Sequence, residues 1–420
     1  MTTTTYEVVD ARSLKAKLAK AERRNKIRAF GLIAPLFLFI VVFFFLPIGT
    51  MLYRSVDNPV IANVFPETTK ALEDWDPTGA PTPPKAVYDA FAGEIAAAYK
   101  ARTVGTVATQ MNFQTSGMRS LFTKSARKVS KMQTGPYQEE EWKTIFINLD
   151  KKWGQQKTWA TFQRLGARVT PVHFLAAVDR TYDEKGDIVP VLERRQIYLL
   201  VFGRTLWISA LVTLMCILLG YPVSFLLASL PLKWSNLLMI LVLLPFWTSL
   251  LVRTTAWVVV LQTEGVLNDV MMFTGIISER IQLIFNRFGV IVAMTHILLP
   301  FMILPIFSVM KNVSPAYVRA AKSLGGSDWT AFWRVYFPMT VPGIGAGGLL
   351  VFILALGYYI TPALVGGPTD QMVSYFIADH TNRSLNWGLA SALGAILLAG
   401  VLAIYLIYNR IVGIDNMKLG

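Results

Sequence analysis

The sequence predicts an all-α membrane protein with six transmembrane helices and a large, mostly helical insertion between the first and second. Apolar residues make up 54% of the 420 residues, charged residues only 16%, and the mean hydropathy is +0.46. Ordinary soluble domains carry about 25% charged residues, and a soluble core cannot bury so much apolar surface. Long stretches without any charged residue then give the positions of the helices.

Six windows contain no Asp, Glu, Lys or Arg, and each is at least 19 residues long. About 20 apolar residues are needed to cross the hydrocarbon core of a bilayer. The first window is too long for the apolar part of a signal peptide and lacks a small-residue cleavage site. We therefore expect a basic tail at 1–28 and transmembrane helix 1 at 29–53. The other windows are 205–232, 234–252, 288–310, 335–369 and 384–409.

The basic residues of the short connections predict the orientation. With the N-terminal tail inside, the tail and the short cytoplasmic pieces hold fifteen Lys and Arg residues, whereas the short external loops hold four. Basic residues are enriched on the cytoplasmic side of membrane proteins. Both termini, including the C-terminal tail 411–420, are therefore expected in the cytoplasm, and the net charge of +14 reflects topology or contact with membrane lipid, not nucleic acid.

The insertion, residues 54–196, has the composition of a soluble domain, with 20 basic and 16 acidic residues. Long domains are translocated largely regardless of charge, so it is expected outside the cytoplasm. After Pro84, apolar residues recur at a spacing of four (Val87, Phe91, Ile95 and Tyr99), which predicts an amphipathic helix.

Two further short helices with aromatic faces are expected at 139–153 and 159–165. Two roles stay open for the insertion: a small helical cap packed on the membrane core, or a docking surface for an external protein.

Enzyme and metal sites are not indicated. No G-x-x-x-x-G-K-[ST] phosphate-binding loop is present, and the G-x-G-x-x-G at Gly343, Gly345 and Gly348 follows no strand. Gly343 and Gly347 instead suit the close approach of two membrane helices. The single cysteine, Cys216, and three scattered histidines predict neither a metal site nor catalytic residues.

The segment 311–340 breaks the apolar pattern in an ordered way. Ser314 and Pro315 predict the start of a helix over 316–324, and Gly325 and Gly326 predict its end in a left-handed cap. Such an elbow either is held by a partner protein or lies on lipid headgroups.

A second helix is expected to follow directly. Ser327 is its predicted cap, Asp328 lies in its positive first turn, and Pro338 is expected to end it. Trp329, Phe332 and Trp333 give this helix an apolar face.

The same segment resembles the cytoplasmic loop of ABC importer permeases, E-A-A-x3-G-x9-I-x-L-P, which docks into a cleft of the ATPase subunit. The chain has Arg319-Ala320-Ala321, then Gly325 after three residues, and Val335-x-Phe337-Pro338 after nine more. The spacing matches throughout, but Arg319 replaces the glutamate and reverses a charge on the docking face.

Further stretches resemble the spermidine/putrescine importer permeases, and together the likeness covers about 203–410. They are Leu218-Leu219-Gly220-Tyr221-Pro222, the run from Leu244 to Thr254 (LPFWTSLLVRT), the run from Leu299 to Pro305 (LPFMILP) and the run from Leu356 to Gly367 (LGYYITPALVGG).

This resemblance implies a type I (MetI-like) permease core at 203–410 in a bacterial inner membrane. It also implies an ABC ATPase dimer that binds ATP and Mg²⁺, a second related permease that forms a heterodimer with this chain, and an extracytoplasmic substrate-binding protein. This chain itself is expected to bind no cofactor and to have no ATPase site.

The implied function is import of a polyamine through a cavity at the membrane midplane. Proline kinks and aromatic faces can supply such a cavity with carbonyl dipoles and π-surfaces, although the aromatic residues also suit interface anchoring. Arg253 would repel a polycation unless it is paired, and Glu264 is a candidate partner. The candidate pathway residues are Trp247, Thr248, Arg253, Trp257, Glu264, His296, Tyr358, Tyr359 and Thr361.

Two alternatives stay open. The first is an ABC permease for another solute, such as ferric iron, an opine or an anion. The second is a membrane receptor or assembly factor whose outer domain senses a ligand. His296, in the middle of the fourth span, is either a packing residue between helices or a pathway residue.

Overall fold

The computed structural model describes residues 11–132, 141–183 and 186–412. The chain divides into two units, Met1–Arg54 and Ser55–Gly420, and each is described by itself. Parts of the two expected cytoplasmic tails (1–10 and 413–420) and the start of the expected helix at 139 lie outside the described residues.

The first unit is a long helical segment. It comprises α1 (Ala11–Ile40), the π-turn η1 (Val41–Phe45) and α2 (Leu46–Arg54), and its membrane-compatible part runs over Ala19–Arg54. The helix therefore starts well before the predicted residue 29, because the basic tail is itself rich in good helix formers such as Ala, Leu and Lys.

The insertion folds as a group of short helices with its own apolar core. Phe91 lies at the centre, with its ring centroid 5.3 Å from that of Phe65 and 4.8 Å from that of Trp153. The Tyr88 hydroxyl and the Trp159 indole N–H each donate to the carbonyl of Trp153 at 2.8 Å. The helices are α3 (Pro59–Val64), α4 (Pro66–Glu73), α5 (Lys85–Lys100), α6 (Val104–Gln114), α7 (Met118–Met132), α8 (Trp142–Leu149), η2 (Lys151–Gly154), α9 (Gln156–Gly166) and α10 (Val172–Ala177).

The predicted amphipathic helix corresponds to α5, where Val87, Phe91 and Ile95 are fully buried. Tyr99 is the exception and is half exposed at the end of the helix. The two later predicted helices correspond to α8 and α9, and the turn η2 lies between them.

The insertion returns to the membrane core through a small hairpin. Strands β1 (Arg180–Tyr182) and β2 (Ile188–Pro190) pair antiparallel, with Arg180 opposite Pro190, and η3 (Glu193–Arg195) follows. The buried Asp179 carboxylate accepts hydrogen bonds from the backbone N–H groups of Ile197, Tyr198 and Leu199 at 2.8–3.1 Å. It therefore caps the first membrane helix of the core.

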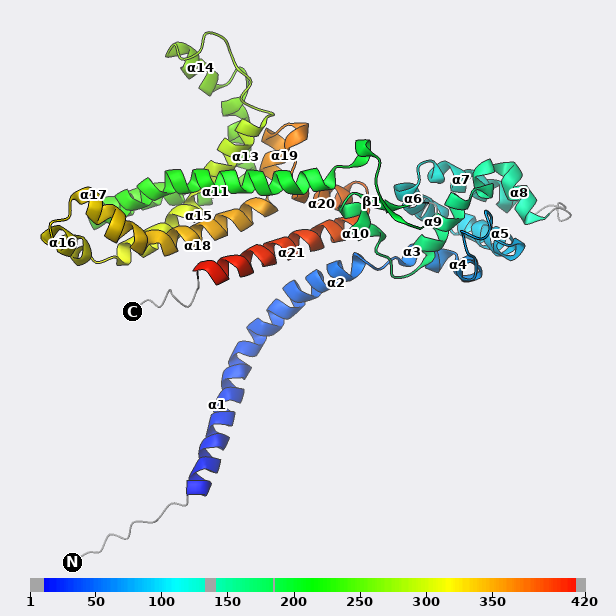
Figure 1. Cartoon of the computed structure of the whole chain (residues 1–420), viewed down its shortest axis with the longest axis horizontal. Helices are drawn as coiled ribbons and strands as arrows, with labels where there is room; N and C mark the ends of the chain where they lie inside the picture. Colours follow the sequence, from blue (N-terminus) through cyan, green and yellow to red (C-terminus); the bar gives the residue numbers. More distant parts are fainter. Residues whose placement is uncertain (1–10, 133–140, 184–185, 413–420) are drawn as a thin grey trace, which may run out of the picture. The chain divides into compact units, whose positions relative to one another are not determined.

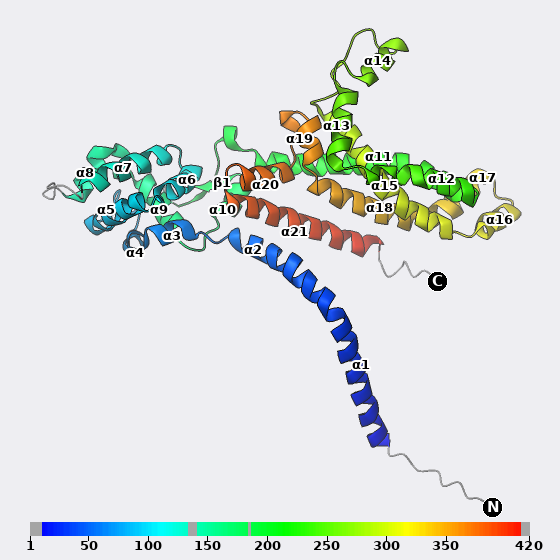
Figure 2. The same ribbon diagram turned by 180° about the vertical axis from the view of Figure 1, so that it is seen from behind.

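The core is built around three long helices, α11 (Tyr198–Ser229), α15 (Arg287–Asn312) and α18 (Phe337–Gly357), which lie side by side in Figures 1 and 2. A Cβ atom on Gly343 would lie 3.1 Å from Cα of Ile306, and one on Gly347 would lie 3.1 Å from the Met302 carbonyl. This confirms the close helix approach predicted from these glycines.

The remaining core elements are shorter, except for α21. They are α12 (Leu232–Leu243), η4 (Leu244–Trp247), α13 (Leu250–Leu261), α14 (Val266–Phe273), α16 (Pro315–Ser323), α17 (Asp328–Ala331), η5 (Phe332–Tyr336), α19 (Ile360–Val365), η6 (Pro368–Asp370), α20 (Val373–Asn382) and α21 (Trp387–Val412).

Among the described residues, six helices are long and apolar enough to cross a membrane, as predicted. Two in the core differ in their bounds. The helix of the fifth expected window, 335–369, ends at Gly357, and the third window, 234–252, is interrupted at Thr248 and Ser249. The Ser249 hydroxyl accepts from the Val252 N–H at 3.2 Å and starts α13 afresh, so the membrane-compatible segment is Leu250–Phe273. Pro245 favours this interruption because it lacks a backbone donor.

Candidate functional site

The first candidate site is the glycine elbow, residues 314–338, and its geometry follows the local sequence closely. The Ser314 hydroxyl accepts from the Ala316 N–H at 3.3 Å, and Pro315 is the first residue of α16. Gly325 has φ +89°, the left-handed conformation that glycine adopts without steric cost. The Gly326 N–H donates to the carbonyl of Ala321 at 3.0 Å, which completes the cap.

The second arm of the elbow also starts as predicted. The Ser327 hydroxyl accepts from the Thr330 N–H at 3.2 Å and caps α17. Lys322, at the end of α16, forms an ion pair with Asp328. This pair joins the two arms, so a displacement of α16 is passed to α17 through both the backbone and a side-chain contact.

The predicted end of the second helix at Pro338 is wrong. Helix continues from α17 through the π-turn η5 into α18, and Pro338 is the second residue of α18. In the π-turn the hydrogen bonds run to the fifth residue back, as the N–H of Phe337 to the carbonyl of Phe332 shows. The wider turn accommodates the proline ring and its missing donor, so the elbow is continuous with a membrane helix.

The outer surface of the elbow is apolar and exposed. Leu324 is 89% exposed and Trp329 72%, and Arg319 and Tyr317 are exposed on α16. A cluster of large exposed apolar side chains marks a surface that contacts a protein or a membrane.

The opposite surface of the elbow anchors it to the core. Phe332 contacts Phe225 of α11 with ring centroids 5.9 Å apart, and Tyr336 contacts the same ring at 5.5 Å. The elbow therefore has one face fixed on the core and one face open.

The second candidate site is a cluster around Arg253 in the membrane part of the core. The Trp257 indole N–H donates to Nδ1 of His296 at 3.1 Å, which joins α13 to α15. One turn away, the hydroxyls of Thr254 and Thr361 are 3.1 Å apart in a buried contact between α13 and α19. Three of the predicted pathway residues, Trp257, His296 and Thr361, are thus held in this region by contacts between sequence-distant helices.

Arg253 is partly buried, and its Nε and Nη1 atoms are enclosed without a hydrogen-bond partner among the described residues. Tyr358 lies in the break between α18 and α19. The predicted partner Glu264 is wrong: it is exposed beyond the end of α13, and no ion pair joins it to Arg253 in the described part of the chain.

The other predicted pathway residues form no hydrogen bond or ring contact with Trp257, His296 or Thr361 in the described part of the chain, and two of them are exposed. Trp247 is 77% exposed in η4, and the Thr248 hydroxyl donates to the Pro245 carbonyl at 2.9 Å. Tyr359 is exposed next to Tyr358.

One polar contact of the core was missed by the sequence reasoning. The buried Asp370 carboxylate accepts from Nε of Arg287 at 3.1 Å and from the Gly367 N–H at 3.3 Å. The pair joins the start of α15 to η6 across 83 positions, and no local pattern connects two such distant residues. In the described residues, no group of three or more His, Cys, Asp or Glu side chains is arranged to hold a metal ion.

Comparison with known proteins identifies the family. Residues 217–414 match the family described as binding-protein-dependent transport system inner membrane component. The chain is 35% identical over 223 residues to the spermidine/putrescine transport system permease protein PotB of Haemophilus influenzae, covering 53% of this chain and 78% of the relative. The chain belongs to this permease family. It is therefore a multi-pass inner-membrane subunit of an ABC importer.

Other transport proteins are similar to about half of this chain. The Escherichia coli PotB is 33% identical, covering 53% of this chain and 81% of the relative. A probable sulfate transport system permease protein, cysT of Marchantia polymorpha, is 28% identical, covering 46% of this chain and 65% of the relative. A crystal structure of a bacterial alginate ABC transporter in complex with its alginate-bound periplasmic protein has TM-score 0.44 and 20% identity, covering 53% of this chain and 80% of that chain. The family match begins at residue 217, so the insertion lies outside it.

Proposed function

We propose that this permease forms a heterodimer with a second, related permease and carries a polyamine into the cytoplasm. An ABC ATPase dimer, which binds ATP and Mg²⁺, supplies the energy, and an extracytoplasmic binding protein delivers the solute. This chain binds no nucleotide and catalyses no reaction. Both of its termini, and the glycine elbow, face the cytoplasm.

The glycine elbow is the observation that carries the coupling part of this proposal. Its exposed residues Leu324, Trp329 and Tyr317 form a surface of the kind that packs into a partner groove. Its other face is fixed on α11 through Phe332. When the groove of the ATPase closes around α16, it therefore displaces α17, which continues through η5 into α18.

The membrane end of this connection lies close to the Arg253 cluster. Helix α18 runs from the elbow to Gly357, and Tyr358 follows it directly. Because α18 packs closely on α15 at Gly343, we expect the two helices to move as a pair. A displacement at the elbow thus reaches Tyr358, which directly follows α18, together with His296 on α15.

The proposal that the solute is a polyamine is supported by the similarity to spermidine/putrescine permeases and by the aromatic faces of Trp257 and Tyr358. Aromatic faces attract ammonium groups. The described membrane helices of the core offer no carboxylate beside these rings, so the second permease is expected to supply one.

A second solute class is favoured by Arg253. A guanidinium with two enclosed, unpartnered N–H groups is costly inside a membrane, and a carboxylate or other anion would satisfy it. A solute that bears an anionic group is therefore the alternative to a simple polyamine.

Uptake by the reconstituted complex separates the two classes. We expect ATP-dependent uptake of labelled putrescine that is inhibited by spermidine and unaffected by γ-aminobutyrate, which has the same amine and a carboxylate. If γ-aminobutyrate inhibits uptake and spermidine does not, the solute belongs to the class that bears an anionic group. Uptake that does not require ATP would contradict the importer mechanism.

A further inference from the structure

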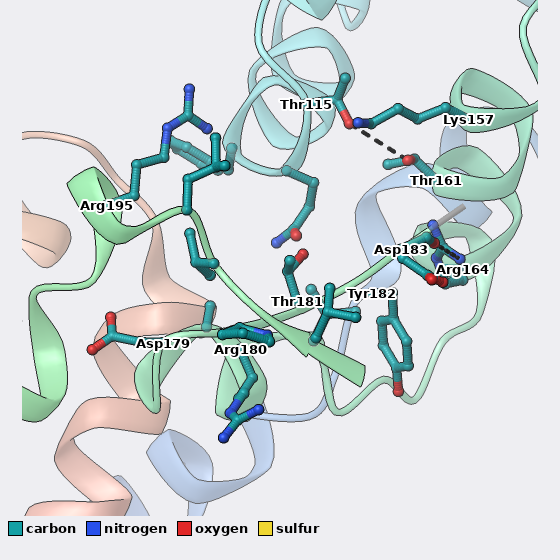
Figure 3. A pocket seen from close by; sticks show the side chains of 18 of the residues that line it. Thr115, Lys157, Thr161, Arg164, Asp179, Arg180, Thr181, Tyr182, Asp183 and Arg195 are labelled. Atoms are coloured by element: carbon teal, nitrogen blue, oxygen red, sulfur yellow. Dashed lines mark hydrogen bonds between the residues drawn. The ribbon is translucent and has the colours of Figure 1, made fainter. Parts of the chain in front are cut away.

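A hollow of about 960 Å³ lies between the insertion and the beginning of the membrane core, outside both sites described above. Figure 3 shows its surroundings: Lys157, Thr161 and Arg164 come from α9, Thr115 follows α6, and Arg195 belongs to η3. Ligand pockets for small molecules usually have volumes of about 300–1,000 Å³. The hollow is therefore large enough for a metabolite.

The acidic residues of this hollow are already committed to structural hydrogen bonds. The Asp179 carboxylate accepts three backbone N–H groups at the start of α11. One oxygen of Asp183 accepts from the Asp187 N–H at 2.8 Å. Asp179 therefore serves the start of α11, and Asp183 serves the turn of the hairpin.

The basic residues are in a different situation. Among the described residues, Lys157 and Arg195 form no ion pair, and in Figure 3 they lie on opposite sides of the hollow. Arg164 is partly buried and lies on the same side as Lys157. It donates from Nη1 to the Asp183 carbonyl at 3.2 Å, and its guanidinium lies 5.3 Å from the centre of the Tyr182 ring.

The neutral polar groups suit the same kind of ligand. The Thr115 and Thr161 hydroxyls are 3.5 Å apart, close to the Lys157 chain in Figure 3. Burial lowers the pKa of Arg164, because water solvates its charge poorly, and the nearby Tyr182 and Asp183 offset this only in part. A bound anion would replace that missing solvation and would accept hydrogen bonds from the threonine hydroxyls.

We propose that the hollow formed by Lys157, Arg164 and Arg195 is a binding site for a small organic anion that carries carboxylate or phosphate groups. The site is distinct from the transport pathway, and a polyamine is repelled by it. Lys157 belongs to the helices of the insertion and Arg195 to the connection into α11. An anion bound to both therefore stabilises the contact between the insertion and the core.

Thermal unfolding of the purified full-length permease in detergent tests this site. Citrate and glycerol 3-phosphate serve as probes of the carboxylate and phosphate classes, each compared with sodium chloride at equal ionic strength. Since a ligand that binds only the folded state stabilises it, we expect a concentration-dependent rise in Tm with at least one anion and none with putrescine. The apparent affinity should fall about tenfold in a variant with both Lys157→Gln and Arg195→Gln.

The matched control is Arg194→Gln, which removes the neighbouring exposed charge of η3 without touching the hollow. It should bind the anion as the unmodified chain does. The proposal is overturned if neither anion raises Tm, or if the double variant and the control respond equally. The measurement needs no transport, so its failure leaves the proposed function unaffected, and a failed uptake assay leaves this site unaffected.

Discussion

Arg319 is the residue at which this chain departs from the docking loop that it otherwise resembles. It is exposed on α16, and Lys322, its neighbour one turn on, is neutralised by Asp328. Among the described residues, α16 therefore presents Arg319 as an exposed positive charge that no ion pair balances. The groove of the proposed ATPase is expected to present a carboxylate at this place, because a buried unpaired charge would weaken the complex.

The charge reversal Arg319→Glu tests this expectation at the scale of one residue. Two negative groups would then face each other, and capture of the ATPase by the permease should weaken by about tenfold at low salt. Because salt screens such interactions, the difference should shrink at high salt.

Lys311→Glu is the control for this variant, because Lys311 is also exposed in the same segment but precedes α16. Equal loss of capture in both variants, or none in Arg319→Glu, would contradict a specific contact at Arg319.

At the scale of elements, the glycine elbow was predictable because its structure depends on residues that are close together in the sequence. Caps at Ser314 and Ser327 and the left-handed Gly325 are local features, and they were found where the sequence placed them. The continuation through Pro338 was not predictable, because it depends on a π-turn that leaves no sequence pattern of its own. The break at Ser249 was not predicted, because the window without charged residues continues across it.

The elbow makes a prediction of its own through Gly325. Proline fixes φ near −65°, which is incompatible with the +89° observed, so Gly325→Pro should misdirect α17 relative to α16. We expect this variant to lose ATPase capture and uptake while it still inserts into the membrane. The measurements are a pull-down from solubilised membranes and vesicle uptake.

Gly325→Asn is the control, because asparagine adopts the left-handed conformation more readily than other non-glycine residues. It should retain most of the activity. Full ATPase capture by the proline variant would show that the elbow geometry does not matter for docking.

At the scale of the whole molecule, the sequence predicted the helices, the insertion and a close helix approach at Gly343 and Gly347, but not the polar contacts between distant helices. The Trp257–His296 and Arg287–Asp370 contacts join residues 39 and 83 positions apart. Such pairs become visible only when the helices are packed. The hollow beside Lys157 and Arg195 was missed for the same reason, since its walls come from the insertion and from the connection into α11.

Residues 56–58 and 168–170 of the insertion lie side by side, which makes the helical part between them separable from the core. The Asn58 N–H donates to the carbonyl of Arg168 at 2.7 Å, and the Thr170 N–H donates to the carbonyl of Val56 at 2.9 Å. An isolated antiparallel bridge pairs Asp57 with Val169. The chain thus enters and leaves this domain at one point, and the aromatic core around Phe91 lies between the two ends in sequence.

Replacing residues 59–168 by a short Gly-Ser linker should therefore leave the membrane core folded. A few residues suffice, because paired strands lie only about 5 Å apart. We expect the shortened chain to insert into the membrane and to capture the ATPase as the full chain does, because the elbow and the α11–α15–α18 packing lie wholly outside the excised part. It should also lose the anion-dependent rise in Tm, since Lys157 and Arg164 are removed. Measurements on solubilised membranes check both results, and degradation of the shortened chain would show instead that the core depends on the insertion for its stability.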